Sequence, residues 1–523
     1  MTREPIADRR LRIVDWLAIR GMSFGLATVL LIGALGVLSA ASFADEPPLP
    51  PGLAPVEDEK SDEPALPPGL APAPAGEEDE PSLPPGLEPA PPNDTEEEPP
   101  LPPGLETSTE QPPSAPPNEP LELPFDTSGF WEARIGARTQ HDTRQKHMSL
   151  AETRLQLEIE RQFQGILFRV KNDFLFDPVQ DDYRNDLETG RGWLDLREAY
   201  AAFTPLDFMD VKVGRQILTW GTGDLVFIND LFPKDWNSFL IGRDMEYLKA
   251  PSDAAKASLF SGLANLDLVY TPAFDADRFI DGSRVTFWNP AAGGLTGRSM
   301  RVRAERPQHW FHDDEIALRL YRNIGGVELA AYGYRGFWKS PAGTNPVNGK
   351  ATFPDLDVVG ASVRGNFLRG VANAEFGYLR SREDLNGRKP LVRNSEMRLL
   401  LGYEQEVARN LTAGAQWYVE HMLDYPDYRR NLPAGAKRAD ETRHVATLRL
   451  TKLMMSQNLR ISVFTFYSPT DRDAFVLPNI HYKLSDRWSV EAGANLFAGE
   501  QPHTFYSQFG PNSNVYAAAR FSF

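Results

Sequence analysis

The sequence has 523 residues and no cysteine. Neither a disulfide framework nor a cysteine-ligated metal site can form, and an exported protein without thiols needs no oxidative folding. No cysteine follows the apparent export signal either, so no lipid anchor is attached to a mature N-terminus. The chain must be stabilised by packing, hydrogen bonding and charge pairing alone.

An excess of charge is also missing from most of the chain. The formal net charge is −17, but residues 1–44 sum to +2, residues 45–125 to −19 and residues 126–523 to zero. The acidity therefore belongs to one segment. Without a basic excess, nucleic acid is not an expected partner, and the net charge does not indicate what residues 126–523 bind.

The N-terminal 44 residues have the pattern of a cleavable signal peptide. Five arginines precede or enter an apolar run over residues 22–38, and Ser42-Phe43-Ala44 gives a small-x-small cleavage site before Asp45. The alternative is a permanent signal-anchor helix, since the run is near the ~17–20 residues of a membrane span. Glycines within the run and the small residues after it favour cleavage.

Residues 45–125 are rich in proline and acidic side chains. Leu-Pro-Pro-Gly-Leu occurs four times, at 49–53, 66–70, 83–87 and 101–105. Proline blocks helix and sheet, and like charges repel, so we expect a disordered segment with polyproline-II stretches. It is either a periplasmic tether whose repeats recruit a partner with an aromatic groove, or a spacer without a partner.

From residue 129 onward the sequence alternates with period two, as in Leu155-Gln156-Leu157-Glu158-Ile159-Glu160. Such alternation predicts half-buried strands. Eighteen strands can be placed, with sixteen as the alternative count, and short connections alternate with long ones. This pattern is typical of an all-β, antiparallel, up-and-down transmembrane β-barrel. We therefore predict a barrel over 126–523 in the bacterial outer membrane, with both termini on the periplasmic side.

The last strand carries the expected assembly signal. Phe521 and the C-terminal Phe523 lie on one face of an alternating strand, which looks like the signal that the barrel-assembly machinery reads. The predicted partners are therefore that machinery and outer-membrane lipid. The oligomeric state is left open.

Strand parity sorts the side chains into two faces. Leu155, Leu157 and Ile159 are predicted to face lipid, and polar neighbours to face a water-filled lumen, since a cation facing lipid costs about 2–4 kcal/mol at the midplane. One wall of the lumen could be rich in cations and attract anions, because three consecutive strands carry Arg169, Lys171, Arg197 and Lys212. The alternative is a ladder of mixed charge. The predicted pore-lining residues are Arg154, Arg169, Lys171, Asp195, Arg197, Lys212, Arg319, Arg398, Arg449 and Arg460.

Two residues break this parity. Glu198 and Arg215 would point to lipid if their strands ran without interruption. A bulge at Gly214 could re-aim them, and the two could pair near the pore rim.

The segment around these residues resembles a block in alginate-export barrels and related outer-membrane porins. The resemblance covers about 40 residues and implies an eighteen-stranded channel, in that family with an arginine-rich pore that passes a polyuronate. This sequence departs from it by its proline-rich segment and by a lumen that arginine does not dominate. The matching positions are Glu198, Tyr200, Gly214, Arg215, Gln216, Trp220, Gly221, Asp230 and Pro233.

The connection over residues 218–252 is long and partly apolar, as in Leu225-Val226-Phe227-Ile228 and Phe239-Leu240-Ile241. Because a loop exposed to water does not normally carry such runs, we expect it to fold inward and constrict the lumen.

Three functions compete. The first is a channel for passive passage or export of a hydrophilic solute, which could be an anionic polysaccharide. The second is a structural or secretion-complex barrel that recruits a periplasmic partner through its repeats. An outer-membrane enzyme is disfavoured because none of the eight histidines has a serine at a recognisable spacing. No cofactor is expected, and His309 with His312 offers too few ligands for a metal site.

Overall fold

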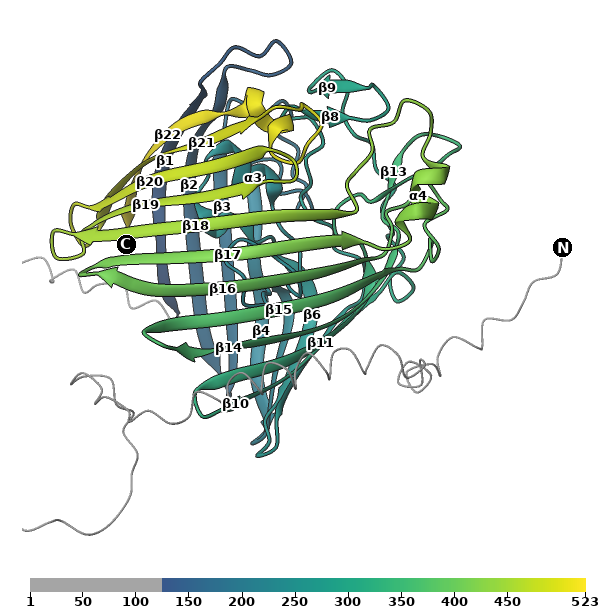
Figure 1. Ribbon diagram of the computed structural model, residues 1–523. Helices are drawn as coiled ribbons and strands as arrows, with labels where there is room; N and C mark the ends of the chain where they lie inside the picture. The colour runs from purple at the N-terminus through teal and green to yellow at the C-terminus, as the bar shows by residue number, and fades with distance from the viewer. Residues whose placement is uncertain (1–124) are drawn as a thin grey trace, which may run out of the picture. The chain divides into compact units, whose positions relative to one another are not determined.

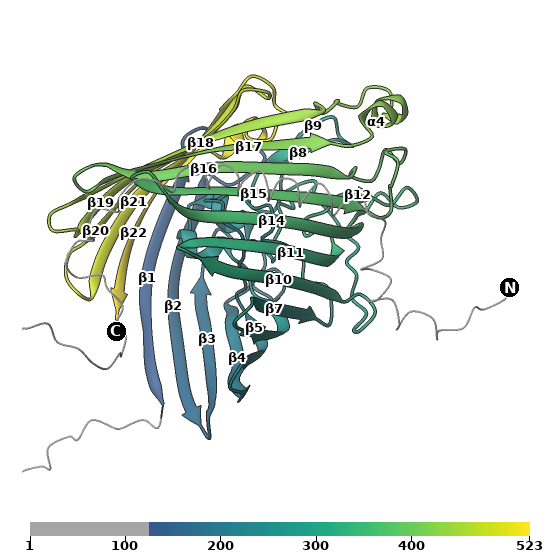
Figure 2. The same ribbon diagram turned by 60° about the horizontal axis from the view of Figure 1, so that its bottom comes forward.

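The computed structural model of the protein describes residues 125–523. The predicted signal peptide over 1–44 and, except for Phe125, the predicted proline-rich segment over 45–125 lie outside the described residues. The described part is a single closed ring of eighteen antiparallel strands (Figures 1 and 2). The first strand pairs with both the second and the last, which closes the barrel.

The eighteen-strand prediction is confirmed and the alternative of sixteen is wrong. The barrel strands are β1 (Asp126–Arg138), β2 (Met148–Phe163), β3 (Ile166–Phe176), β4 (Leu194–Leu206), β5 (Met209–Gln216), β6 (Ser252–Leu259), β7 (Asn265–Thr271), β10 (Glu315–Ile324), β11 (Val327–Phe337), β14 (Asp355–Phe367), β15 (Gly370–Ser381), β16 (Glu396–Ala408), β17 (Leu411–Met422), β18 (Thr442–Met454), β19 (Leu459–Ser468), β20 (Asp473–Lys483), β21 (Trp488–Gly499) and β22 (Asn514–Ser522).

The connections differ at the two ends of the ring. At one end, which we call the short-turn end, Gln164-Gly165 and Gly325-Gly326 have positive φ and form two-residue hairpin turns. At the other, the long-loop end, the connections include 217–251 and 272–314. The connections at the long-loop end together contain the short elements β8 (Phe287–Asn289), β9 (Gly294–Thr296), β12 (Gly343–Thr344), β13 (Ala351–Thr352), α3 (Trp236–Ile241), α4 (Tyr425–Asn431), η2 (Met245–Leu248) and η3 (Ser507–Asn512). Within residues 125–523 no helix is long and apolar enough to cross a membrane.

The outer surface of the ring is apolar. On β2, the predicted lipid-facing positions pair with apolar side chains of β3, as Leu155 does with Phe174 and Ile159 with Val170. A water-soluble protein rarely exposes a continuous apolar surface of this kind, whereas a barrel in a bilayer requires it. Large apolar side chains at least 38% exposed on the outward faces include Ile135, Val170, Leu268, Leu320, Leu401, Trp417, Leu448, Leu450, Ile480 and Val515.

A bulge between β3 and β4 explains one break in parity. Lys171 pairs with Glu198 and Asn172 with Leu196, so Arg197 is the extra residue. Beyond the bulge Glu198 faces the lumen, 3.4 Å from the Arg169 guanidinium. The prediction of a bulge at Gly214 was wrong, because the pairing of β5 is regular at that residue.

Arg215 has different partners from the one predicted. Its guanidinium contacts Asp253 at 2.9 Å and donates to the carbonyl of Leu187 at 2.6 Å. It therefore lies at the outer side of the long-loop end, covered by the connection 177–193. The predicted pairing of Arg215 with Glu198 was wrong, since each is bound to other groups.

The interior contains packed apolar clusters as well as polar surface. One cluster joins Ile228, Leu240 and Ile241 of the connection 217–251 to inward-facing side chains of β16–β21, such as Leu400 and Phe475. A second joins Leu218 and Phe232 of the same connection to β6–β15. The expectation of a lumen without a packed core is therefore corrected: the half toward the long-loop end is partly filled.

Candidate functional site

The connection 217–251, which we call the inward loop, enters the lumen as predicted. One wall holds it through Glu375 of β15, whose side chain is 1% exposed. The Glu375 carboxylate accepts hydrogen bonds from the backbone N–H groups of Thr222 and Asn229, both at 2.8 Å, and from both of their side chains. Four donors from the loop thus satisfy one buried carboxylate.

The same wall has a notch that admits the loop. Gly360 of β14 and Gly377 of β15 are directly paired across strands. A Cβ at Gly360 would lie 1.8 Å from Asn229 Oδ1, and one at Gly377 would lie 2.6 Å from Ile228 Cγ2. The loop sits where the wall lacks side chains.

The loop also contacts the opposite wall. Arg243 Nη2 lies 2.6 Å from Glu152 of β2, and Arg520 of β22 contacts Asp244 and Glu246, each at 3.0 Å. Between these anchors, Asp224 pairs with Arg449 of β18 at 2.6 Å. The loop therefore crosses the lumen and is fixed on both sides, which narrows any path through the barrel.

Much of the family-motif block forms the root of this loop. The Gln216 side chain is fully buried and donates to the Ala254 carbonyl at 2.9 Å. Trp220 packs edge-on against Phe232, and Asp230 pairs with Lys234 at 3.0 Å.

The motif glycines and proline have backbone roles. Gly221 has φ +87° beside Glu375, Gly214 has φ +125° against the Ala199 carbonyl, and the Pro233 carbonyl accepts from Ala250 N–H. These positions shape the root of the inward loop.

A second long connection, 272–314, also enters the mouth of the barrel, which the sequence analysis did not predict. Arg278 contacts Asp195 of β4 at 2.7 Å and Asp235 of the inward loop at 3.5 Å. Arg284 contacts Asp177 at 2.8 Å. Apolar side chains enter with these arginines, since Val285 is fully buried in the first cluster and Ile280 and Phe287 pack against it.

Three of the predicted pore-lining residues face inward but are covered. Arg154 is 2% exposed, pairs with Glu152 and Asp173, and has the Tyr247 ring of the inward loop 4.0 Å from its guanidinium. Asp195 and Arg197 are 3% and 2% exposed, and Arg197 donates to the Lys249 carbonyl at 2.6 Å. These side chains support the inserted loops and do not line open space.

Most of the other predicted cations have carboxylate partners. Arg169 contacts Glu158, Glu160 and Glu198, and Lys171 lies 3.7 Å from Glu158. Arg319 pairs with Glu328, Arg398 with Glu396, and Arg449 with Asp224. Within residues 125–523, Lys212, which stacks over the Tyr200 ring, and Arg460 have no carboxylate within 4.0 Å. The contacts form a mixed-charge ladder more than a cation-rich wall.

The predicted assembly residues lie at the closing joint of the ring. The backbones of Gly129 and Phe523 exchange two hydrogen bonds of 3.0 Å. Phe521 pairs with Trp131 across the joint and packs against Trp488 at 5.1 Å. Recognition of these residues by the assembly machinery remains a prediction.

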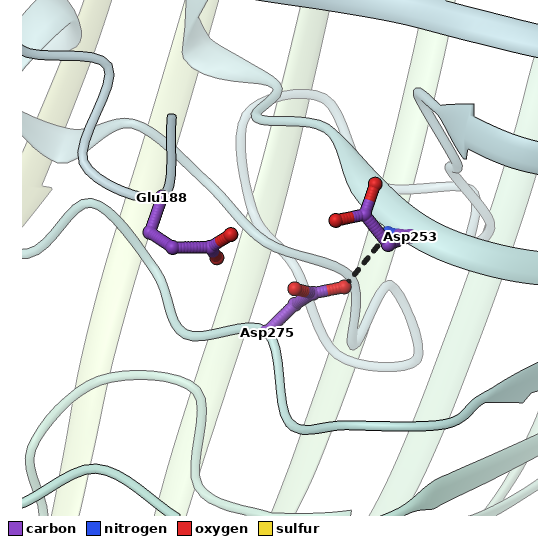
Figure 3. A group of neighbouring side chains, drawn as sticks. All are labelled: Glu188, Asp253 and Asp275. Atoms are coloured by element: carbon purple, nitrogen blue, oxygen red, sulfur yellow. Dashed lines mark hydrogen bonds between the residues drawn. The ribbon is translucent and has the colours of Figure 1, made fainter. Parts of the chain in front are cut away.

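Three carboxylates gather at the long-loop end, where Glu188, Asp253 and Asp275 lie near one another (Figure 3). Burial raises the pKa of Asp275 to about 7. Its Oδ2 accepts from Ser252 Oγ at 2.7 Å and from the Asp253 N–H at 2.8 Å. With Arg215 on Asp253, the group is a hydrogen-bonded joint between two connections and β6, which does not require a cation.

His309 and His312 share one acidic partner. Their Nδ1 atoms lie 3.0 and 2.7 Å from the two oxygens of Asp313. Burial alone would raise the pKa of Asp313, but the hydrogen bonds from these histidines lower it to about 2. The arrangement fixes the turn before β10.

The fold and its apolar outer surface define the protein as a β-barrel of the bacterial outer membrane. No protein-family model and no curated protein matches the chain. Among solved structures it is similar to Pseudomonas aeruginosa OccD3, with 10% identity over 76% of this chain and 91% of that one and a TM-score of 0.44. Acinetobacter baumannii OccAB1 is 8% identical over 76% of this chain and 96% of its own, with a TM-score of 0.46. A mutant of the Rh. blastica porin is 10% identical over 76% of this chain and 100% of its own, with a TM-score of 0.35.

With sequence identities of 8–10% and TM-scores below 0.5, these structural similarities support no conclusion about function. The family of the resemblance, the alginate-export barrels, is not shown by them. The barrel class follows from the closed sheet and the outward apolar band of this chain itself.

Proposed function

We propose that the protein is a channel for passive passage of small hydrophilic solutes across the outer membrane. The observation that carries this is the inward loop fixed across a closed, largely polar lumen: Glu375 holds it on one wall, and Arg243 and Arg520 connect it to the opposite wall. Such an arrangement limits the size of a solute without closing off the charged surface below it.

The charge ladder supports only a weak preference for anions. Cations and carboxylates alternate along β2–β5, as Arg169 does with Glu158 and Glu198. Lys212 and Arg460 are the cations of the predicted set that have no carboxylate partner among residues 125–523. We therefore expect modest anion selectivity. Export of a polysaccharide would require the inward loop to leave its anchors.

Single-channel recording tests the proposal. The mature chain is reconstituted in a planar bilayer, and the reversal potential is measured under a salt gradient. The proposal predicts a stable small conductance with a reversal potential shifted slightly toward that of the anion. A correctly folded barrel, shown by its circular dichroism, that never conducts would contradict it and favour the structural role that was the alternative.

A further inference from the structure

Five of the eight turns at the short-turn end carry an arginine that has no ionic partner in the described chain. These turns follow β2, β10, β14, β16 and β20, and all five arginines are exposed. Within residues 125–523 none of them forms a salt bridge. The five are Arg161, Arg322, Arg369, Arg409 and Arg487.

Two of these arginines lie on the outer face of the ring. Arg161 is opposite Phe168, an outward side chain that is 44% exposed. Arg322 lies two positions after Leu320, which faces outward and is 50% exposed, so strand alternation places both on the same face. The other three lie in the turns themselves. The lipid-facing surface is thus bordered by cations at the short-turn end.

Each of the five arginines has a large apolar neighbour within three residues. These neighbours are 49–85% exposed, and they lie beside the outward apolar band of the barrel. Apolar side chains in this position extend the surface that contacts lipid. They are Phe163, Ile324, Leu368, Val407 and Leu484.

The carboxylates of the same turns do not neutralise the arginines. Asp486 binds Lys483 at 3.0 Å, and Glu406 accepts from the Asn410 N–H at 2.5 Å. Asp207 lies in the turn after β4, which has no arginine. The positive charge at this end therefore remains available to an external anion.

Arginines outside the long-loop end are arranged differently. Arg335 and Arg382 both contact Asp357, at 3.9 and 3.3 Å, and Arg382 also contacts Asp355 at 3.3 Å. There the protein supplies its own counter-charges. At the short-turn end the counter-charge must come from the surroundings.

We propose that the short-turn end binds the phosphate groups of anionic phospholipids. An arginine side chain can lie along apolar surface and place its guanidinium among lipid head groups, where it binds phosphate through two parallel hydrogen bonds. The apolar neighbour then contacts the hydrocarbon of the same lipid. A free phosphate ion would match the arginine alone, whereas a phospholipid matches both side chains of each turn.

Electron spin resonance with spin-labelled lipids tests the proposal on the full mature chain. The protein is reconstituted in phosphatidylcholine vesicles with a trace of labelled phosphatidylglycerol or labelled phosphatidylcholine, and the fraction of label immobilised by the protein is compared. Averaged over all lipids that contact the barrel, we expect a preference of about twofold for phosphatidylglycerol, which weakens at high salt. Equal immobilisation of the two labels would overturn the proposal.

Variants assign the preference to the short-turn end. A triple variant with Arg322→Gln, Arg369→Gln and Arg409→Gln removes the charges of three consecutive turns and should lose most of the preference. The matched control replaces three exposed arginines of the long loops by glutamine and should keep it; these are Arg184, Arg430 and Arg472. An unchanged preference in the first variant, with its fold verified by circular dichroism, would contradict the assignment.

The acidic segment 45–125 is the other source of anions, since it precedes β1 in the chain. We expect the same lipid preference with and without this segment. A preference that appears only after its deletion would identify the segment as the occupant and overturn the proposal. The lipid contact does not depend on conduction, so a barrel that prefers phosphatidylglycerol but does not conduct removes the channel and leaves this inference intact.

Discussion

At the residue scale, Glu375 is the side chain on which the inward loop depends most. Its buried carboxylate has no salt bridge within residues 125–523 and is satisfied by Thr222 and Asn229 alone. Removing a hydrogen-bonded partner from a buried site costs about 1–3 kcal/mol for each group left unsatisfied. The position of the loop is thus sensitive to a change of a single atom.

Glu375→Gln should release part of the inward loop. The amide nitrogen would face N–H donors in place of one carboxylate oxygen, so we expect a larger and noisier single-channel conductance and a loss of about 1–3 kcal/mol in the stability of the loop anchor. Glu404→Gln on β16 is the matched control, since among the described residues no hydrogen bond links Glu404 to the loop. The same conductance in wild type and Glu375→Gln would show that the anchor does not hold the constriction.

The glycine pair makes a second residue-scale prediction. In Gly377→Ala the new methyl would meet Ile228 Cγ2 at 2.6 Å, so the loop must move, and conductance should rise as for Glu375→Gln. In Gly414→Ala the new methyl would approach only the flexible Glu404 side chain, at 3.2 Å, and should change little. Equal conductance in the two alanine variants would argue against the notch.

The alternation of polar and apolar residues along a strand could predict whether a side chain faces the lumen or the lipid. It could not predict which loop residues bury that side chain. Arg154 faces inward, as alternation requires, yet it is buried beneath Tyr247, which is 93 positions further along the chain. The bulge at Arg197 was missed because an extra residue leaves no mark on composition. The anchor at Glu375 depends on the path of the inward loop, which only the tertiary structure fixes.

At the element scale, the apolar runs in the inward loop identified it correctly, because burial of Leu225–Ile228 and Phe239–Ile241 demands an apolar surface. The lumen side of β16–β21 supplies that surface. The connection 272–314 is held through charged residues and also through Val285, which lies in the same cluster, but its apolar residues are interspersed with charged ones over 274–285. Hydropathy therefore found one of the two inserted connections.

Protease protection tests the inward loop. Lys234 is 3% exposed and the Arg243 side chain 10%, so trypsin should not cut after either while the barrel is folded. Lys437 and Arg438, in the exposed connection after α4, should be cleaved readily and act as an internal control. Fragments cut at Lys234 as quickly as at Arg438, found by mass spectrometry, would place the loop outside the lumen.

The joint at Asp275 predicts a pH dependence. Its pKa is raised from 3.8 to about 7, so the fold prefers the protonated acid. The stabilisation is complete below pH 3.8 and is lost as the pH rises toward 7 and above. Hydrogen exchange in 272–314 should therefore be faster at pH 8 than at pH 5, after correction for intrinsic rates.

Asp275→Asn is the control for that experiment. The amide resembles the protonated acid and can still accept from Ser252 Oγ. It should give protection that does not change with pH. A wild-type and variant pair with the same pH profile would mean that another group causes the effect.

At the scale of the whole molecule, residues 126–523 contain every strand of the closed ring. The fold class, strand count and approximate boundaries followed from period-two alternation and connection lengths, because a barrel must satisfy every backbone group and present one apolar face. The contents of the lumen did not follow, because they depend on long-range contacts.

Deletion of residues 45–125 should leave the unitary conductance unchanged, because the ring closes through β1 and β22 alone. Single-channel recording of the two forms decides this. A lost or altered conductance would make the proline-rich segment part of the channel. Normal conductance with loss of a co-purifying periplasmic protein would support the proposal that the repeats recruit a partner.

The closing joint of the ring is not its weakest part. β1 and β22 pair at nine positions, and the inward loop braces them from inside through Arg134, which donates to the Gly242 carbonyl, and Arg520, which binds Asp244. β6 and β7 pair at only five positions. Under lateral force the barrel should therefore open between β6 and β7. Because the inward loop leads directly into β6, the same opening would also displace the constriction from the lumen.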